Sequence, residues 1–275
     1  MSLNSLFSGV PVADFHVHVF PDDVASRALD TLLSAYGVEP VTDGTVSGLL
    51  AHMRASGVLW SVVQPVATKP SQVRSINDWA ASHTEPGIIS FGAVHPDSID
   101  PARDVDDVVS RGLPGIKIQA NWQNVYVDEP RMYPIYEAAQ GRLIVLFHSG
   151  DELTPFDELK ATPKRIARVL ADFPRLTIVA AHMGGYRMWD DVEKHLLGRE
   201  IYLDTSACFP EDLPDDRFLD MIRRHGADKI LFATDSPFGD ATRDIPRLAK
   251  MGLSDDELEL IFHGNARRLL GDQLG

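Results

Sequence analysis

The sequence predicts an α/β protein built as a single (β/α)8 TIM barrel. Short apolar runs recur along the 275 residues, and each is followed by a stretch with helix-type spacing. Most of these runs are continuously apolar rather than alternating, as expected of parallel strands that are covered on both faces. Eight such pairs fit the length of about 250 residues that is typical of one barrel. An open doubly wound sheet is the alternative architecture.

The predicted strands are the apolar runs rich in β-branched and aromatic residues. Their number and their alternation with helix-type segments favour a parallel sheet over hairpins. They cover residues 12–18, 58–64, 88–94, 115–118, 143–147, 176–181, 201–204 and 230–234.

The predicted helices begin at residues that commonly cap helices. Asp100 and Thr162 each stand directly before a proline, which fits the first position of a helix. Ser71 precedes a run with apolar residues at helical spacing. Ser254 is followed by three acidic residues, which is typical of a capping box, and we expect this last helix to continue to about Leu270.

The composition is that of an ordinary globular protein, with 44% hydrophobic and 24% charged residues. No Pro-, Gly- or Ser-rich linker divides the chain, so we expect one domain over residues 1–275. The single cysteine, Cys208, excludes an internal disulfide and a cysteine-rich zinc module.

The charge balance and the hydropathy limit the possible partners. The net charge of −14 argues against nucleic acid and against an anionic membrane surface, since both require a basic face. No apolar stretch approaches the length of a membrane helix, and residues 1–10 lack the layout of a signal peptide. We therefore expect a cytoplasmic protein with a small-molecule substrate, and a homodimer is possible because such barrels often pair through their outer helices.

The most informative segment is ADFHVHVF at residues 13–20. His16 and His18 are two residues apart on a predicted strand, so their imidazoles project from the same face. His148, His182 and Asp235 each directly follow another predicted strand. The carboxyl ends of barrel strands meet at one mouth, and imidazole and carboxylate groups are common ligands of divalent metals. The sequence therefore predicts a metal site there.

These residues belong to a set of motifs that resembles the amidohydrolase superfamily. The likeness is to its amidohydrolase-related (amidohydrolase 2) branch, which also contains aminocarboxymuconate-semialdehyde decarboxylase. The motifs occur in the family's order along almost the whole chain. They are the His-x-His of residues 13–20, GIKIQ (115–119), HSG (148–150), AHMGG (181–185), ATDSPFG (233–239) and GNARRLLG (264–271).

The resemblance implies a role for each of these side chains. His16, His18, His148 and Asp235 would bind the metal, and Asp235 and His182 would be catalytic. Lys117 occupies the place where some two-metal relatives carry a carboxylated lysine, but the residues after it depart from the family pattern. We therefore expect Lys117 to bind a substrate carboxylate as a free lysine. One divalent ion is expected, zinc above others, although two ions remain an alternative.

The predicted activity is hydrolysis. An ion with an open position lowers the pKa of bound water to about 7, so hydroxide could attack an amide, ester or lactone of a small, carboxylated substrate. Asp235 would accept the proton of that water, and His182 would stabilise charge on the carbonyl oxygen. A metal-dependent decarboxylase, a carbon–carbon lyase, is the alternative in the same fold. A non-catalytic binding barrel is a third hypothesis.

Four further residues have both a functional and a structural interpretation. His95 follows the third predicted strand and could line the mouth. Arg187 and Arg243 follow two of the family motifs and could bind a substrate carboxylate, but a surface salt bridge explains each equally well. Cys208 has no catalytic partner nearby in the sequence, which argues against a cysteine nucleophile.

Overall fold

The computed structural model describes residues 10–83 and 85–274. This part of the chain forms two compact units, and each is described by itself. Unit 1 holds residues 10–63, 86–88 and 204–274, and unit 2 holds residues 64–83, 85 and 89–203.

The core of unit 2 is a parallel sheet in which each strand pairs with the next one along the chain. Strand β6 is buried along its whole length, which explains its continuously apolar sequence, whereas β5 is equally buried but includes Lys117. The carboxyl ends of these strands therefore lie along one edge of the sheet. The strands are β4 (Gly92–Ala93), β5 (Gly115–Ile118), β6 (Ile144–Phe147), β7 (Thr177–Ala180) and β8 (Tyr202–Asp204), whose last residue belongs to unit 1.

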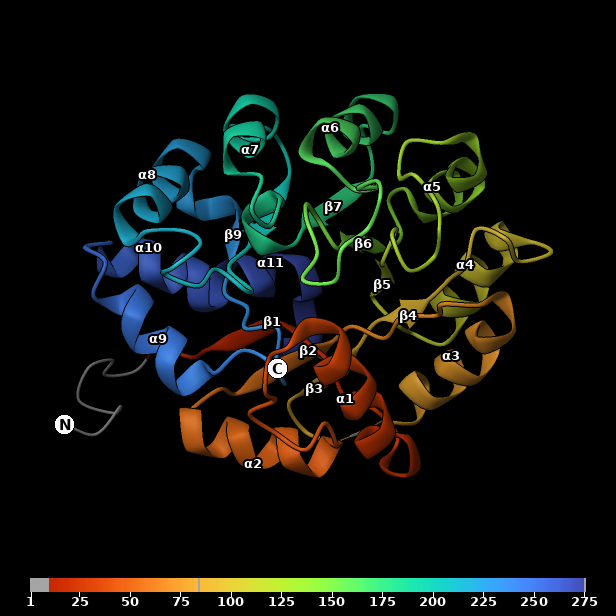
Figure 1. Ribbon diagram of the computed structural model, residues 1–275, viewed down its shortest axis with the longest axis horizontal. Helices are drawn as coiled ribbons and strands as arrows, with labels where there is room; N and C mark the ends of the chain where they lie inside the picture. The colour runs from red at the N-terminus through yellow and green to blue at the C-terminus, as the bar shows by residue number, and fades with distance from the viewer. Residues whose placement is uncertain (1–9, 84, 275) are drawn as a thin grey trace. The chain divides into compact units, whose positions relative to one another are not determined.

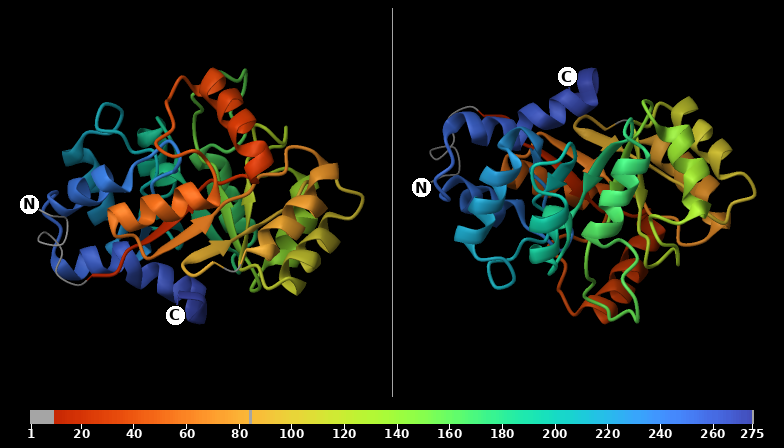
Figure 2. Two further views of the ribbon diagram at one scale, coloured as in Figure 1. Left: turned by 90° about the horizontal axis from the view of Figure 1, so that it is seen from below. Right: turned by 90° about the horizontal axis from the view of Figure 1, so that it is seen from above.

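Helices cover the outer face of this sheet (Figure 1). Helix α4 packs against α5 and α6 packs against α7, and Figure 2 shows the first of these pairs side by side in both further views. Two of the predicted caps are present, because the side chains of Asp100 and Thr162 accept hydrogen bonds from the backbone at the start of α4 and α6. The helices are α3 (Val73–Ser82), α4 (Pro101–Ser110), α5 (Tyr133–Ala139), α6 (Pro163–Asp172) and α7 (Trp189–His195).

In unit 1, strand β1 (Ala13–Val17) pairs in parallel with β2 (Trp60–Val63). The segment after β9 (Ile230–Leu231) runs along the other side of β1. Phe15 N–H donates to the carbonyl of Phe232 at 2.9 Å, and Asp235 N–H donates to the carbonyl of His16 at 2.9 Å. This pairing brings the end of β1 beside Asp235. The helices of this unit are α1 (Asp22–Tyr36), α2 (Val46–Ser56), α8 (Asp215–His225), α9 (Ala241–Ala249), α10 (Asp255–Glu259) and α11 (Asn265–Leu270).

The structure confirms the predicted parallel α/β fold, with three local differences. The predicted strand 230–234 is limited to β9, Ile230–Leu231, so Asp235 lies in the segment after this strand. The range 88–94 holds two strands, β3 (Ile88–Ser90) and β4, because pairing is interrupted at Phe91. The last helix is broken: Ser254 forms the predicted capping box, but a π-helical turn, Leu260–Gly264, separates α10 from α11. Short 3-10 turns connect other elements at Pro70–Gln72, Pro130–Met132, His182–Gly184, Ala227–Lys229 and Gly271–Leu274.

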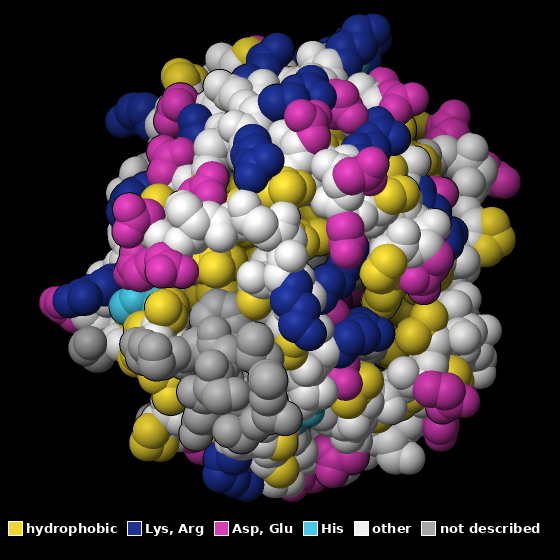
Figure 3. Space-filling view, turned by 90° about the vertical axis from the view of Figure 1, so that its left-hand side faces the viewer, with side chains coloured by type: hydrophobic (Ala, Val, Ile, Leu, Met, Phe, Trp, Pro, Cys, Tyr) yellow, Lys and Arg dark blue, Asp and Glu magenta, His cyan; other side chains and the backbone are white. Residues whose placement is uncertain are grey.

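Charged side chains of both signs are interspersed on the molecular face drawn in Figure 3. Among the described residues, no helix combines the length and the apolar character needed to cross a bilayer. The predicted lack of a leader concerns residues 1–10, of which residues 1–9 lie outside the described residues. The single domain over residues 1–275 stays a prediction.

Candidate metal centre and catalytic residues

Three of the predicted metal ligands meet in unit 1, and we call them the unit 1 cluster: His16, His18 and Asp235. His16 Nε2 lies 3.2 Å from His18 Nε2, and Asp235 Oδ1 lies 3.4 Å from His16 Nε2 and 3.2 Å from His18 Nε2. The His16 side chain is fully buried, whereas those of His18 and Asp235 are 22% and 23% exposed. The cluster therefore has one anchored member and one side open to a ligand.

The spacing of these atoms fits one divalent cation. Ligand atoms held at about 2.1 Å from an ion lie roughly 3.0–3.4 Å apart in octahedral or tetrahedral geometry. Imidazole nitrogen and carboxylate oxygen suit zinc, manganese and related ions. The donor set thus fits the predicted metal but does not select one ion.

Asp204 orients the His16 ring, and sequence reasoning missed it. His16 Nδ1 donates to Asp204 Oδ2 at 3.0 Å, and both side chains are fully buried. Ser206 adds to this arrangement, because its Oγ lies 3.2 Å from His16 Nδ1 and also bonds Asp204 Oδ1. An ionised carboxylate accepts hydrogen bonds and donates none, so His16 donates from Nδ1. In the neutral ring the Nε2 lone pair then faces the cluster.

A second buried carboxylate connects strand β1 to the segment after β9, and these two segments carry the cluster. Asp14 on β1 accepts bonds from Thr234 Oγ1 at 2.6 Å and from Thr234 N–H at 3.0 Å. Burial raises the pKa of Asp14 to about 7, against the opposing effect of these hydrogen bonds. Thr234 directly precedes Asp235, so Asp14 fixes Asp235 relative to β1.

The backbone at Asp235 adopts a conformation that non-glycine residues rarely occupy. Its φ is +67°, and His182 in unit 2 has a φ of +58°. Such left-handed residues are energetically costly and gather at functional sites. The strain falls on two of the residues that the sequence analysis assigns to catalysis.

The other two predicted histidines meet in unit 2, and we call them the unit 2 pair: His148 and His182. They follow β6 and β7, and His182 Nε2 lies 3.1 Å from His148 Nδ1. His148 Nε2 donates to the carbonyl of Asp151 at 3.0 Å. Because a carbonyl only accepts, His148 has a proton on Nε2. In the neutral ring the lone pair on Nδ1 then accepts the hydrogen bond from His182 Nε2.

Glu152 is a further unpredicted neighbour of the unit 2 pair. Its Oε1 lies 3.3 Å from His148 Nε2 and accepts a bond from Asn121 Nδ2 at 3.2 Å. The Glu152 side chain is only 2% exposed. This buried carboxylate lies close enough to the His148 imidazole to help orient its ring.

Lys117 lies within β5, next to the last residue of the strand, and is 2% exposed. Burial of a lysine requires polar partners or loss of its charge. The position agrees with a group that serves a site rather than with a surface cation. Its assignment to a substrate carboxylate stays a prediction.

Other predicted residues have structural surroundings. His95 is buried, and its Nδ1 accepts a bond from Asp97 N–H at 3.1 Å. The guanidinium of Arg187 lies 4.8 Å from the ring centre of Tyr186. Cys208 is buried, and burial raises the pKa of its thiol well above the ordinary value, which argues against a nucleophile as expected.

One signal could have found Asp204. It is the last residue of the predicted strand 201–204, one position before the place that His148, His182 and Asp235 have relative to their predicted strands. Glu152 follows His148 by four residues in a loop, and no periodic pattern marks it.

Parallel strands that carry histidine and carboxylate side chains at their ends define a metal-dependent enzyme of the TIM-barrel class. A family model described as amidohydrolase matches residues 13–271, so the chain belongs to the amidohydrolase family. No curated protein matches the chain.

Solved structures with the same fold share little sequence with the chain. A 5-carboxyvanillate decarboxylase from Sphingomonas paucimobilis is 17% identical, covers 95% of this chain and 99% of its own, and has a TM-score of 0.72. An uncharacterised TIM-barrel protein from Bordetella bronchiseptica is 20% identical, with coverage of 96% and 99% and a TM-score of 0.74.

A third similar structure is a dihydroxybenzoic acid decarboxylase from a Polaromonas species, with bound manganese and the inhibitor 2-nitroresorcinol. It is 18% identical, covers 94% of this chain and 96% of its own, and has a TM-score of 0.68. These likenesses confirm the predicted TIM-barrel fold. The family and the unit 1 cluster together support a divalent metal.

Proposed function

We propose that the protein is a metal-dependent decarboxylase of small aromatic carboxylic acids. The convergence of His16 Nε2, His18 Nε2 and Asp235 Oδ1 within 3.4 Å carries the metal-dependent part of this proposal. The similar structures named as decarboxylases support the choice of reaction. Hydrolysis, which the sequence analysis favours, is named for neither of these two structures and becomes the alternative outcome of the test.

The residues of the unit 1 cluster would hold the ion. A divalent ion there supplies Lewis acidity, which stabilises negative charge on a substrate oxygen. Asp204 and Ser206 keep His16 in the tautomer that presents its Nε2 lone pair. His148 is also proposed as a ligand, as the sequence analysis predicts, and to bind the ion its Nδ1 would have to release the hydrogen bond from His182. Zinc remains the predicted ion although one similar structure carries manganese.

Loss of CO2 leaves an electron pair on carbon, and a proton must replace the carboxyl group there. We assign His182 to this step because its Nε2 has the proton in the unit 2 pair. Before the reaction, His148 Nδ1 accepts a hydrogen bond from this N–H group. The carbonyl of Asp151 fixes the tautomer of His148. Overall, the carboxylate of the substrate and one proton give CO2 and a new C–H bond, and His182 regains its proton from solvent.

The experiment combines metal analysis with two assays. Protein purified without chelator is analysed for metal, and then incubated with 2,6-dihydroxybenzoate and 5-carboxyvanillate to measure CO2, and with lactones and amides to measure released acid. We expect one ion per chain and CO2 release that a chelator abolishes. Acid release without CO2 would replace decarboxylation by hydrolysis, and metal-free turnover would end the proposal.

The His16→Ala variant tests the ligand assignment, with His195→Ala as its control. His195 is a histidine of α7 outside both histidine groups. We expect His16→Ala to lose metal and CO2 release together, whereas His195→Ala retains both. A full metal complement in His16→Ala would remove the assignment of His16.

A further inference from the structure

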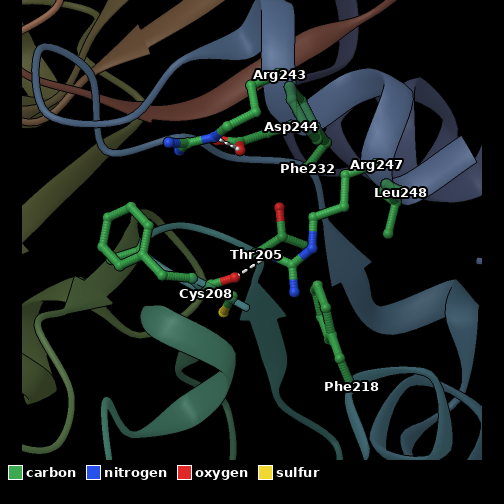
Figure 4. A pocket seen from close by; sticks show the side chains of 10 residues that line it. Thr205, Cys208, Phe218, Phe232, Arg243, Asp244, Arg247 and Leu248 are labelled. Carbon is green, nitrogen blue, oxygen red and sulfur yellow. Dashed lines mark hydrogen bonds and ion pairs between the residues drawn. The ribbon is translucent and has the colours of Figure 1, made fainter. Parts of the chain in front are cut away.

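Unit 1 contains a pocket beside the cluster that no step of the proposed function uses. Its enclosed part has a volume of about 20 Å3, and the space continuous with solvent around it brings the total to about 330 Å3. The pocket lies between the loop after β8 and helix α9 (Figure 4). Thr205 and Ala207 line it, and Ser206 between them contacts His16. The pocket therefore borders the segment that orients the metal ligand.

Two arginines from one face of α9 line this pocket, and their partners differ. Arg247 donates from Nε to Asp215 at 2.8 Å, and its terminal nitrogens bond Asp215 and the carbonyls of Cys208 and Leu213. Its guanidinium is thus saturated by the protein. Arg247 has a structural role, because it joins α9 to the loop after β8 and to the start of α8.

Arg243 is held from one side only. Its Nε donates to Asp244 Oδ1 at 2.9 Å, and its guanidinium lies 5.5 Å from the ring centre of Phe209. Within residues 10–83 and 85–274, no group hydrogen-bonds to the two terminal nitrogens of Arg243. The side chain is 52% exposed. Asp244 and Phe209 therefore orient the planar guanidinium of Arg243, and its two terminal nitrogens are available to a ligand.

The chemistry of the remaining wall indicates what the ligand is. Phe209, Phe218, Phe232 and Leu248 make the lining largely apolar. A guanidinium edge with two parallel N–H groups matches a carboxylate in bidentate geometry. Apolar and aromatic walls favour a flat hydrocarbon body attached to that carboxylate.

We propose that Arg243 and Phe209 form the anchoring site for a carboxylate of an aromatic ligand. The inference depends on the proposed function in one respect, since it makes that ligand the substrate of the metal centre. Arg243 would be a binding residue that lowers KM, and it takes no part in proton transfer. The alternative from the sequence, a surface salt bridge, accounts for its Nε atom alone.

The test measures binding without turnover. Isothermal titration of the metal-loaded protein compares benzoate with benzamide, which has the same shape and no charge. We expect benzoate to bind more tightly, and Arg243→Gln to weaken benzoate binding about 10- to 100-fold with little effect on benzamide. Arg243→Lys, which keeps the charge and loses the fork, should recover only part of the affinity.

Arg224→Gln is the matched control, because it removes one positive charge from the exposed face of α8, outside the pocket. We expect it to leave benzoate binding unchanged. Equal benzoate affinity in Arg243→Gln and wild type, or equal affinity of wild type for benzoate and benzamide, would overturn the inference. Neither result bears on metal-dependent CO2 release, so the two proposals fail separately.

Discussion

At the scale of single residues, Asp204 determines which nitrogen of His16 faces the unit 1 cluster, although Asp204 is not itself a proposed ligand of the metal. Asp204 bonds His16 on the nitrogen that faces away from the cluster. Its charge stabilises the Nδ1–H tautomer and makes Nε2 a stronger ligand. A histidine alone would divide its population between two tautomers, of which one presents a proton to the ion.

Asp204→Asn should therefore weaken metal binding about 10- to 100-fold, because the ring loses its charged acceptor. The measurement is the dissociation constant of the metal in competition with a coloured chelator. Asp220→Asn, an exposed carboxylate of α8, is the charge-matched control and should bind metal as the wild type does. Equal affinity in Asp204→Asn and wild type would show that Asp204 does not orient the ligand.

His95 gives stability a dependence on pH. Burial lowers the pKa of His95, with Asp97 acting in the opposite direction, and its Nδ1 is already an acceptor of the Asp97 N–H. The unfolded chain takes up this proton near pH 6.5 and the folded chain only at lower pH. The stability contribution of His95 is thus complete above about pH 6.5 and is lost as the pH falls towards the folded-state pKa.

The variant His95→Gln removes this titration and keeps an acceptor for the Asp97 N–H. Urea unfolding at pH 7 and pH 5 should show a smaller loss of stability in the variant than in the wild type. Other histidines titrate in both proteins, so the difference between the two proteins isolates His95. An identical loss in both would mean that the pKa of His95 is not lowered by the fold.

At the scale of helices and strands, local sequence determines where elements begin. Thr162 Oγ1 accepts a bond from Arg165 N–H at the start of α6, and Pro163 occupies the first helical position. Thr162→Ala should destabilise the protein by about 1 kcal/mol, since it leaves a helix N–H without its partner. The check is the free energy of unfolding in urea.

Thr31→Ala is the control for the capping prediction. Thr31 lies inside α1, is exposed, and bonds only a carbonyl of its own helix at 2.8 Å. An exposed substitution of this kind changes stability by less than about 0.5 kcal/mol. Equal effects of the two variants would mean that the cap of α6 contributes nothing beyond helix propensity.

The same local rules explain what could and could not be predicted from the sequence. A continuous apolar run identifies β6 because this strand is buried along its whole length. The break at Phe91 and the π-helical turn at Leu260–Gly264 depend on packing against distant residues, which no local pattern records. Asp204 and Glu152 were not predicted for a related reason. Each acts by contacting a histidine that only the folded chain brings beside it, His16 for Asp204 and His148 for Glu152.

At the scale of the whole molecule, metal binding and folding are coupled through distant segments. His16 and Asp235 are 219 positions apart, and the backbone bonds between β1 and the segment after β9 bring them together. The cluster exists only in the folded chain, so an ion that binds it must stabilise the fold. A bound cation also neutralises part of the net charge of −14, which reduces the repulsion between negative charges in the folded chain.

Removal of the metal should therefore lower the unfolding temperature. An ion present at about 100 times its dissociation constant stabilises the folded state by about 2.7 kcal/mol, which is a shift of roughly 5–10 °C for a chain of this size. Calorimetry of the wild type with manganese or zinc, and after chelation, measures this difference. His16→Ala should show almost no shift, whereas His195→Ala should shift as the wild type does. A metal-induced shift of equal size in His16→Ala would place the stabilising ion away from the unit 1 cluster.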